Sequence, residues 1–194
     1  QSLLCARKEV GGQSHFVQAD LRRLPFAKNT FDAIFICFVL EHLPDPLDVL
    51  NSMKTLLKPK GTITAIEGDH GSAFFHPETP EALAVWKCLQ QLQVQSNGDG
   101  HIGRRLYTIF QKSEATTISI KPLPVYCDPG LPRMMEGFVD KTIVGMLRGI
   151  EEEVISRNMI KEEVWHKGLD SLLRLSKSKE GTFMYTFFRA EASY

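Results

Sequence analysis

Residues 30–44 read TFDAIFICFVLEHLP, and this stretch decides the fold of the chain. From Phe31 to Val39 it is an almost unbroken apolar run with several residues that favour β-structure. A run of this length is typical of a strand that is buried on both faces, as strands of parallel sheets are. Pro44 and Pro46 follow and break the chain direction. We therefore predict a central strand of an α/β sheet over residues 31–38.

The residues on either side of this strand alternate between helical and extended patterns. Apolar side chains recur at helical spacing from Leu47 to Leu57, and Lys58-Pro59-Lys60-Gly61 ends that helix. The extended run over 61–66 follows at once, which predicts a strand–helix–strand unit with a right-handed connection. Elsewhere we expect strands over 15–19, 116–125 and 182–189, helices over Gln1–Val10, 81–95, 102–111, 131–158 and 161–176, and a polar, aromatic loop over Glu67–Pro80. The alternation indicates one α/β domain, residues 1–194, with helices on both faces of one sheet.

The composition argues against several classes of partner and location. Lys and Arg total 23, as do Asp and Glu, so the formal net charge is zero. A protein that coats nucleic acid or an anionic membrane needs a basic excess, and we therefore expect no nucleic-acid partner. No apolar stretch approaches the ~18 residues of a membrane-spanning helix. The four cysteines lie far apart, which is typical of reduced thiols and favours a cytoplasmic location.

Three stretches, in this order and spacing, resemble a known family: VQADLRRLPF at 17–26, TFDAIFICFVLEHL at 30–43 and LLKPKGT at 56–62. They are similar to the class I S-adenosylmethionine-dependent methyltransferases, in the small-molecule branch often likened to quinone-biosynthesis methyltransferases. The resemblance implies a Rossmann-like sheet whose antiparallel last strand lies beside the 61–66 strand. It also implies S-adenosylmethionine as the cofactor, and a helical insertion over residues 131–176 that covers the site as a lid.

The resemblance assigns the cofactor to the carboxyl ends of the strands, where ligands of open α/β sheets bind. In similar proteins the acid that matches Asp20 accepts a hydrogen bond from the adenine amino group, and the next N–H, that of Leu21, meets a ring nitrogen. Cys37, Phe38 and Val39 match residues that line the methionine part of the cofactor. The alternatives are that Asp20 only caps a turn and that the other three are plain core.

Residues expected to face the methyl acceptor follow the 61–66 strand or begin a later helix. We expect Glu67, Asp69, Phe74 and Arg104 to bind the acceptor, and His42, His70 or His76 to orient or deprotonate it. His42 also falls beside the expected cofactor and is counted among its contacts. The alternatives are a loop cap for His42, a polar loop with one packed histidine for 67–76, and ordinary ion pairing for Arg104. The acids and histidines here match no metal-ligand spacing, so no metal is expected.

The resemblance also implies that a segment of the family's domain is missing. The glycine-rich loop after the family's first strand, and the acid that ends its second strand, match nothing in this sequence. We therefore expect the chain to be the C-terminal two-thirds of a methyltransferase domain without its first two strands. The expected function is methyl transfer to an N, O or C atom of a small molecule, which is the expected partner. The alternative is a non-catalytic methyltransferase-like binding subunit or a degenerate relative.

The chain as given should bind S-adenosylmethionine weakly or not at all, because the glycine-rich loop and the ribose-binding acid have no counterpart in it. Isothermal titration calorimetry on residues 1–194 measures this affinity directly. A dissociation constant in the low micromolar range or below would show that the cofactor-binding residues have been assigned to the wrong part of the sequence.

Overall fold

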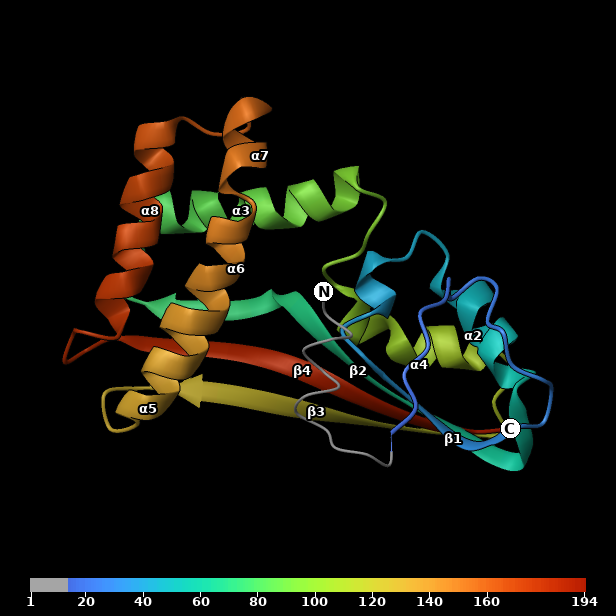
Figure 1. The fold of residues 1–194 in the computed structure, drawn as a ribbon. Helices are drawn as coiled ribbons and strands as arrows, with labels where there is room; N and C mark the ends of the chain where they lie inside the picture. The colour runs from blue at the N-terminus through green and yellow to red at the C-terminus, as the bar shows by residue number, and fades with distance from the viewer. Residues whose placement is uncertain (1–13) are drawn as a thin grey trace.

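The computed structural model describes residues 14–194, and the predicted helix Gln1–Val10 lies outside the described residues. These residues form a four-stranded sheet in the order β1-β2-β4-β3 (Figure 1). The strands are β1 (Phe31–Cys37), β2 (Leu57–His76), β3 (Thr117–Cys127) and β4 (Thr182–Ser193). β1 is parallel to β2, whereas β4 is antiparallel to both β2 and β3, between which it lies. The predicted α/β sheet, with an antiparallel last strand beside the 61–66 strand, is confirmed.

Two of the longer helices begin at sequence signals that cap their first turns. The described helices are η1 (Leu40–His42), α2 (Pro46–Lys54), α3 (Pro80–Gln95), α4 (Ile102–Lys112), α5 (Pro132–Met134), η2 (Met135–Ile143), α6 (Val144–Gly149), α7 (Glu151–Ser156) and α8 (Glu162–Leu175). Asp45 caps α2 by accepting the N–H of Asp48 at 3.0 Å. Thr79 caps α3 by accepting the N–H of Ala82 at 3.2 Å. A proline follows each cap, at a helical position whose N–H would have no partner.

The stretch over 131–158, predicted to be helical with Gly137, Gly145 and Gly149 as the points where it could break, is interrupted once. From α5 through η2 to α6 the chain stays helical, with π-helical geometry in η2. The helix then ends at Gly149, and Ile150, with a φ of −109°, separates α6 from α7. Gly137 and Gly145 lie inside helical turns. Of the three glycines in this stretch, therefore, only Gly149 coincides with a break.

Two apolar cores lie on opposite faces of the sheet and near opposite ends of it. One core packs Ile63 and Ala190 against α2 and α4, and the other packs Phe183 and Tyr185 against α3, α6 and α8. Figure 1 shows α2 and α4 near one end of the sheet and α3, α6 and α8 near the other. Side chains alternate between the faces of a strand, so on β4 Phe183 and Tyr185 point away from the face that holds Ala190. Helices therefore cover both faces, as the sequence predicts.

The predicted strand over residues 15–19 is wrong. These residues adopt no regular structure, and Val17 is 50% exposed. A strand needs a neighbour that donates and accepts its backbone hydrogen bonds, and an extended pattern alone does not supply one. Within residues 14–194, β1 is paired along one edge only, with β2, and no strand lies beside residues 15–19.

The predicted loop over Glu67–Pro80 is also wrong, because β2 continues as far as His76. Its Glu67–Asp69 and Phe74–His76 parts both pair with β4. The pairing register shifts between these two parts, which means that the residues between them form a bulge or another irregularity in the strand. The long aromatic strand β4 supplies hydrogen-bonding partners along this whole length, and these convert a polar segment into strand.

No helix within residues 14–194 combines the length and the apolar character that crossing a bilayer requires. Cys37, Cys88 and Cys127 are free thiols, and Cys5 lies outside the described residues. Cys37 is exposed at the end of β1, whereas the other two are buried.

Two aromatic residues on α4 test the assignment of the first core. Phe110 is fully buried in it, whereas Tyr107, on the same helix, is 53% exposed. Phe110→Ala should lower the free energy of unfolding by about 3–5 kcal/mol, since it removes a large side chain and leaves a cavity. Tyr107→Ala is the matched control and should change it by no more than about 0.5 kcal/mol. Urea denaturation measures both, and equal losses in the two variants would contradict this packing.

Candidate functional site

The chain turns sharply where β1 ends. Phe38 has a φ of 54°, in the left-handed region that a residue with a bulky side chain seldom adopts. Its N–H still donates to the carbonyl of Ile66 on β2 at 3.0 Å. The single turn of η1 follows, and its last residue, His42, is exposed. The carboxyl end of β1 is thus a tight turn that is hydrogen-bonded to the neighbouring strand.

A buried carboxylate on β2 receives the backbone of this turn. Glu67 is fully buried, and its Oε1 accepts the N–H groups of Val39 at 3.1 Å and Leu40 at 2.9 Å. Its Oε2 accepts the N–H of Glu41 at 3.4 Å. Burial raises the pKa of Glu67, and the hydrogen bonds from the Leu40 and Val39 amides oppose that rise. The expectation that Glu67 binds the acceptor is therefore corrected, because its oxygens face protein backbone.

His70 is buried against the second core and is not placed to act as a base. The hydroxyl of Tyr185 lies 2.8 Å from its Nδ1, and the indole N–H of Trp86 donates to its backbone carbonyl at 2.9 Å. Burial lowers the pKa of His70 to about 4, and the positive charge of His101 adds to the effect. The imidazole is therefore neutral near pH 7, but its Nδ1 is engaged by Tyr185 and it lines neither of the cavities described below, so its role as a general base stays a prediction that this packing does not support.

The groups around His70 favour one of its two neutral tautomers. Burial raises the pKa of Tyr185, so its phenol stays protonated and can donate to Nδ1. In that tautomer the proton of the neutral ring lies on Nε2, which is buried, has no hydrogen-bond partner within residues 14–194, and is 3.8 Å from a carboxylate oxygen of Glu41. Glu41 is itself held by the side-chain amide of Gln93 at 3.3 Å. A connected polar cluster thus lies between η1, β2, β4 and α3.

Asp69 and Arg104, both expected to bind the acceptor, bind each other. Arg104 donates from Nε to Oδ2 at 2.6 Å and from an Nη nitrogen to Oδ1 at 2.9 Å. Such a two-pronged pair is the strongest geometry between these side chains. The Asp69 side chain is 3% exposed and that of Arg104 is 51% exposed. The acid is therefore committed to joining β2 to α4, and this pairing corrects the assignment of Asp69 as an acceptor contact.

His76 and Phe74 lie at the far end of β2, away from β1. They pair with Thr182 and Met184 of β4, whereas β1 pairs with β2 only as far as Ile66. Both side chains are exposed. The structure does not bring them to the carboxyl end of β1, and the expectation that they join His42 in one site is corrected.

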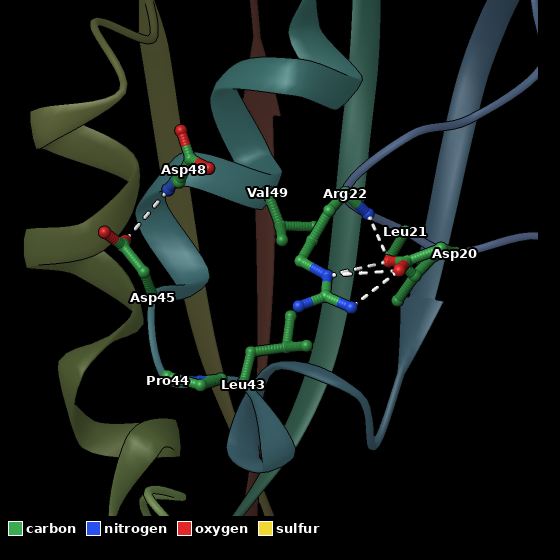
Figure 2. Close-up of a pocket in the computed structure, with 8 residues that line it drawn as sticks. All are labelled: Asp20, Leu21, Arg22, Leu43, Pro44, Asp45, Asp48 and Val49. Atoms are coloured by element: carbon green, nitrogen blue, oxygen red, sulfur yellow. Dashed lines mark hydrogen bonds and ion pairs between the residues drawn. The ribbon is translucent and has the colours of Figure 1, made fainter.

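A cavity of about 420 Å³ lies between the loop around Asp20 and the connection from η1 to α2. Figure 2 shows the residues that line it, which are Asp20, Leu21, Arg22, Leu43, Pro44, Asp45, Asp48 and Val49. Its walls combine leucine, valine and proline side chains with charged groups near the rim. Two of the predicted cofactor residues, Asp20 and Leu21, therefore line one cavity together with the segment that follows His42.

The Asp20 carboxylate in this cavity is already engaged by Arg22 (Figure 2). Arg22 donates to it from its backbone N–H at 2.9 Å, from Nε at 3.0 and 3.2 Å, and from an Nη nitrogen at 2.7 Å. These hydrogen bonds lower the pKa of Asp20 to about 2, so the acid is ionised at neutral pH. Both residues are exposed, and an exposed pair of this kind is easily rearranged.

A second cavity, of about 270 Å³, lies on the other side of the same turn. It is lined by His42, Leu89, Leu92, Gln93, Ser96, Gly98, Ile150 and Glu153, which come from η1, α3 and the junction of α6 with α7. His42 lines this cavity and the next residue, Leu43, lines the first. Adjacent residues of one turn therefore border two different cavities. Within residues 14–194, no group of three or more metal-ligating side chains could hold an ion.

Aromatic side chains connect the end of β1 to the segment predicted as a lid. The ring of Phe38 lies 5.3 Å from that of Phe187, which lies 4.8 Å from Tyr185 and 6.0 Å from Phe138 of η2. Sequence reasoning did not single out Tyr185, Phe187 or the lining residues of α3 and α7. The only available signal was the aromatic pattern of β4, because helical periodicity does not reveal what a helix faces.

The sequence of residues 1–65 matches the family model described as a methyltransferase domain. Over 60 residues the chain is 43% identical to the ubiquinone/menaquinone biosynthesis C-methyltransferase UbiE of Ectopseudomonas mendocina, and over 58 residues it is 45% identical to UbiE of Azotobacter vinelandii. These matches cover 31% and 30% of this chain, and 23% of each relative. The matched part thus spans about a quarter of the length of these curated relatives.

Two solved structures share the fold. One is a candidate methyltransferase from Bacillus halodurans, with a TM-score of 0.52 at 12% identity, covering 93% of this chain and 78% of that one. The other is the YcgJ protein from Bacillus subtilis, with a TM-score of 0.52 at 14% identity, covering 99% and 75%. The Rossmann-like fold is confirmed by these likenesses. The resemblance to the class I, quinone-biosynthesis-like methyltransferases is confirmed by the sequence matches.

The burial of His70 makes stability depend on pH in a defined direction. The pKa of His70 in the folded protein, about 4, lies below the ordinary value of 6.5. The contribution of His70 to the free energy of unfolding is therefore complete above pH 6.5 and is lost as the pH falls through 4. His70→Gln keeps an acceptor for Tyr185 and removes the titration. Between pH 7 and pH 4 it should therefore lose less unfolding free energy than the wild type, by up to about 3 kcal/mol.

Urea denaturation at a series of pH values measures this difference, and His166→Gln, at an exposed position on α8, is the matched control. Equal pH dependence in wild type and His70→Gln would mean that His70 is not buried in its neutral form.

Proposed function

We propose that this protein, whose first third is a class I methyltransferase sequence, transfers the methyl group of S-adenosylmethionine to an N, O or C atom of a small molecule. One observation carries the proposal. The two residues that the resemblance assigns to the adenine, Asp20 and Leu21, line a cavity with Leu43 and Pro44. Those two follow directly on the turn that the resemblance assigns to the rest of the cofactor.

The chemistry of this cavity fits an adenine ring. Leu21, Leu43 and Val49 supply apolar wall, and the ionised Asp20 supplies an acceptor for an amino group. Arg22 donates hydrogen bonds to both carboxylate oxygens of Asp20, so one of these oxygens has to turn from Arg22 toward the adenine. Because this pair is exposed, breaking part of it costs little free energy.

The methionine part of the cofactor would lie over the end of β1, beside Cys37, Phe38 and Val39. When bound, the cofactor supplies an electrophilic methyl group on a sulfonium. The residues of the chain then have to orient the acceptor, exclude water and, where the acceptor carries a proton of high pKa, remove it.

The acceptor would occupy the second cavity. Leu89, Leu92 and Ile150 form an apolar wall that excludes water, and His42 is a polar group at its edge. The imidazole Nε2 of His42 lies 3.6 Å from a carboxylate oxygen of Glu41, which can steady the ring. In this arrangement His42, whose neighbour Leu43 lines the first cavity, orients or deprotonates the acceptor.

Residues 131–176 would act as the lid of this cavity within a single methyltransferase domain. Ile150 and Glu153 from this segment line the cavity, and Phe138 continues the aromatic row that starts at Phe38. The insertion therefore contributes wall to the acceptor side only, since none of its residues lines the cavity beside Asp20.

Two substitutions separate the proposed roles in an active, full-length enzyme. His42→Ala should reduce turnover about 10²–10⁴-fold with an acceptor that must lose a proton, while leaving cofactor affinity within a factor of two. Asp20→Ala should do the reverse and weaken cofactor binding about ten- to a hundredfold, as expected when a buried partner loses its hydrogen bond. Transfer of labelled methyl groups measures the first effect, and calorimetry measures the second.

His166→Ala, which removes an exposed histidine from α8, is the matched control and should leave both quantities unchanged. Wild-type turnover in His42→Ala would clear the second cavity of a role in the reaction. A protein that binds the cofactor but methylates no acceptor would support the non-catalytic alternative.

A further inference from the structure

We infer that Glu67 is the positioning residue of this site: its buried carboxylate fixes the turn from Phe38 to His42 without touching either cavity. The consequence of this role for catalysis rests on the proposed function, whereas the hydrogen bonds of Glu67 do not depend on it. Glu67 is fully buried and lines neither the cavity beside Asp20 nor the cavity beside His42. Its carboxylate instead accepts the N–H groups of three consecutive residues, Val39 to Glu41.

The turn needs an outside acceptor because it cannot cap itself. The first N–H groups of any helix have no partner inside the helix. Val39, which stands at the capping position of η1, makes no side-chain cap hydrogen bond, as expected for an apolar side chain. Unpaired N–H groups at this depth are costly, since Leu40 is fully buried. Glu67 on the neighbouring strand therefore does what Asp45 does for α2, from a distant position in the sequence.

The charge of Glu67 is balanced by these backbone groups. Within residues 14–194, no Lys, Arg or His makes an ion pair with it, and burial, with a smaller contribution from the charge of Glu41, raises its pKa against the effect of the backbone hydrogen bonds. Three N–H dipoles at the start of a helical turn are the compensating charge, and they bind an ionised carboxylate more strongly than a neutral amide. An uncharged replacement of the same size should therefore hold the turn less well.

Two contacts with β2 together hold the strained residue Phe38. The N–H of Phe38 donates to the carbonyl of Ile66. The N–H groups of the next three residues donate to the side chain of Glu67, which follows Ile66 on the same strand. A φ of 54° persists in such a residue only when its surroundings over-determine it. Releasing the Glu67 contact leaves Phe38 and His42 free to move, although neither touches the Glu67 carboxylate.

Amide hydrogen exchange tests this role without any assay of methyl transfer. Glu67→Gln keeps the size of the side chain but turns its NH₂ group toward backbone N–H donors. Exchange of the amides at residues 39–41 should accelerate about tenfold or more, while peptides from β4 and α3 keep their protection. Asp69→Asn is the matched control, because it removes the other fully engaged carboxylate from the same strand and should leave residues 39–41 protected.

Unchanged exchange at residues 39–41 in Glu67→Gln, or equal acceleration in Asp69→Asn, would overturn the inference. If Glu67→Gln fails to fold, Glu67→Asp decides instead. This variant keeps the charge but shortens the side chain by one methylene group. The amides of residues 39–41 should again exchange faster than in the wild type, while amides elsewhere keep their protection. Equal acceleration throughout the chain would contradict the role.

Kinetics of the full-length enzyme then separate this inference from the proposed function. If both hold, Glu67→Gln should lower turnover and cofactor affinity together, whereas Asp69→Asn should lower neither by more than about twofold. Local acceleration of exchange in an enzyme that transfers no methyl group would support the role of Glu67 and contradict the proposed function. Wild-type turnover and affinity in a Glu67→Gln variant with accelerated exchange would show that the turn does not set the site, and would overturn the inference for catalysis.

Discussion

Strand β4 is hydrogen-bonded along both of its edges, to β2 and to β3, and helices pack on both of its faces at opposite ends. Strands β2, β3 and β4 each contribute residues to both cores. Alanine side chains near the end of β4 leave room for α4, and aromatic side chains near its start fill the space under α3 and α8. Without β4, the second half of β2 would have no partner strand among the described residues.

The buried charges gather where β2 passes from one core to the other. Between Glu67 and His70 three ionisable side chains are almost fully enclosed, and each has a different kind of partner. Glu67 binds backbone N–H groups, Asp69 binds Arg104, and His70 binds the phenol of Tyr185. Buried polar groups are tolerated only with such partners, and here the partners tie η1, α4 and β4 to β2. The polar stretch that looks like a loop in the sequence is a junction between elements.

The part of the fold that could be predicted depends on local pattern. The apolar run of β1 and the helix after it are legible because β-favouring residues and helical periodicity leave direct marks on the sequence. The predicted burial of β1 on both faces is wrong for the described residues, since Ile36 alone is buried in this strand and Phe35 is 65% exposed. Residues 15–19 carry an equally extended pattern and form no strand, since pairing depends on a neighbour and not on the residues themselves. The continuation of β2 past Glu67 escaped prediction for the converse reason, because its partner lies more than a hundred residues away in the chain.

The same contrast divides the candidate site. Asp20, Leu21 and His42 are predicted from short motifs, and each lines a cavity, although Asp20 and Leu21 follow no strand in the described part of the chain and the roles of all three stay predictions. The contacts of His70, Asp69 and Glu67 could not be predicted, since what these residues face is decided by Tyr185, Arg104 and the backbone of η1, which the sequence gives no means of placing. The partner of each is distant in the chain, and polarity alone does not distinguish a residue that binds a ligand from one that binds the protein.

Adjacent residues of one turn border the two cavities, so a ligand that displaces this turn links binding in one cavity to binding in the other. A ligand that displaces Leu43 also moves His42, because both belong to a turn that is held as a unit by β2. Occupancy of one cavity then changes the affinity of the other, and the change is the same in whichever order the two ligands bind. The sign of this linkage depends on how the turn moves. A ligand that stiffens the turn in its present position favours binding of the second ligand. A ligand that pushes the turn into the other cavity excludes the second ligand. Ordered or mutually exclusive binding is thus a property of three consecutive residues, Glu41 to Leu43, and needs no movement of the sheet.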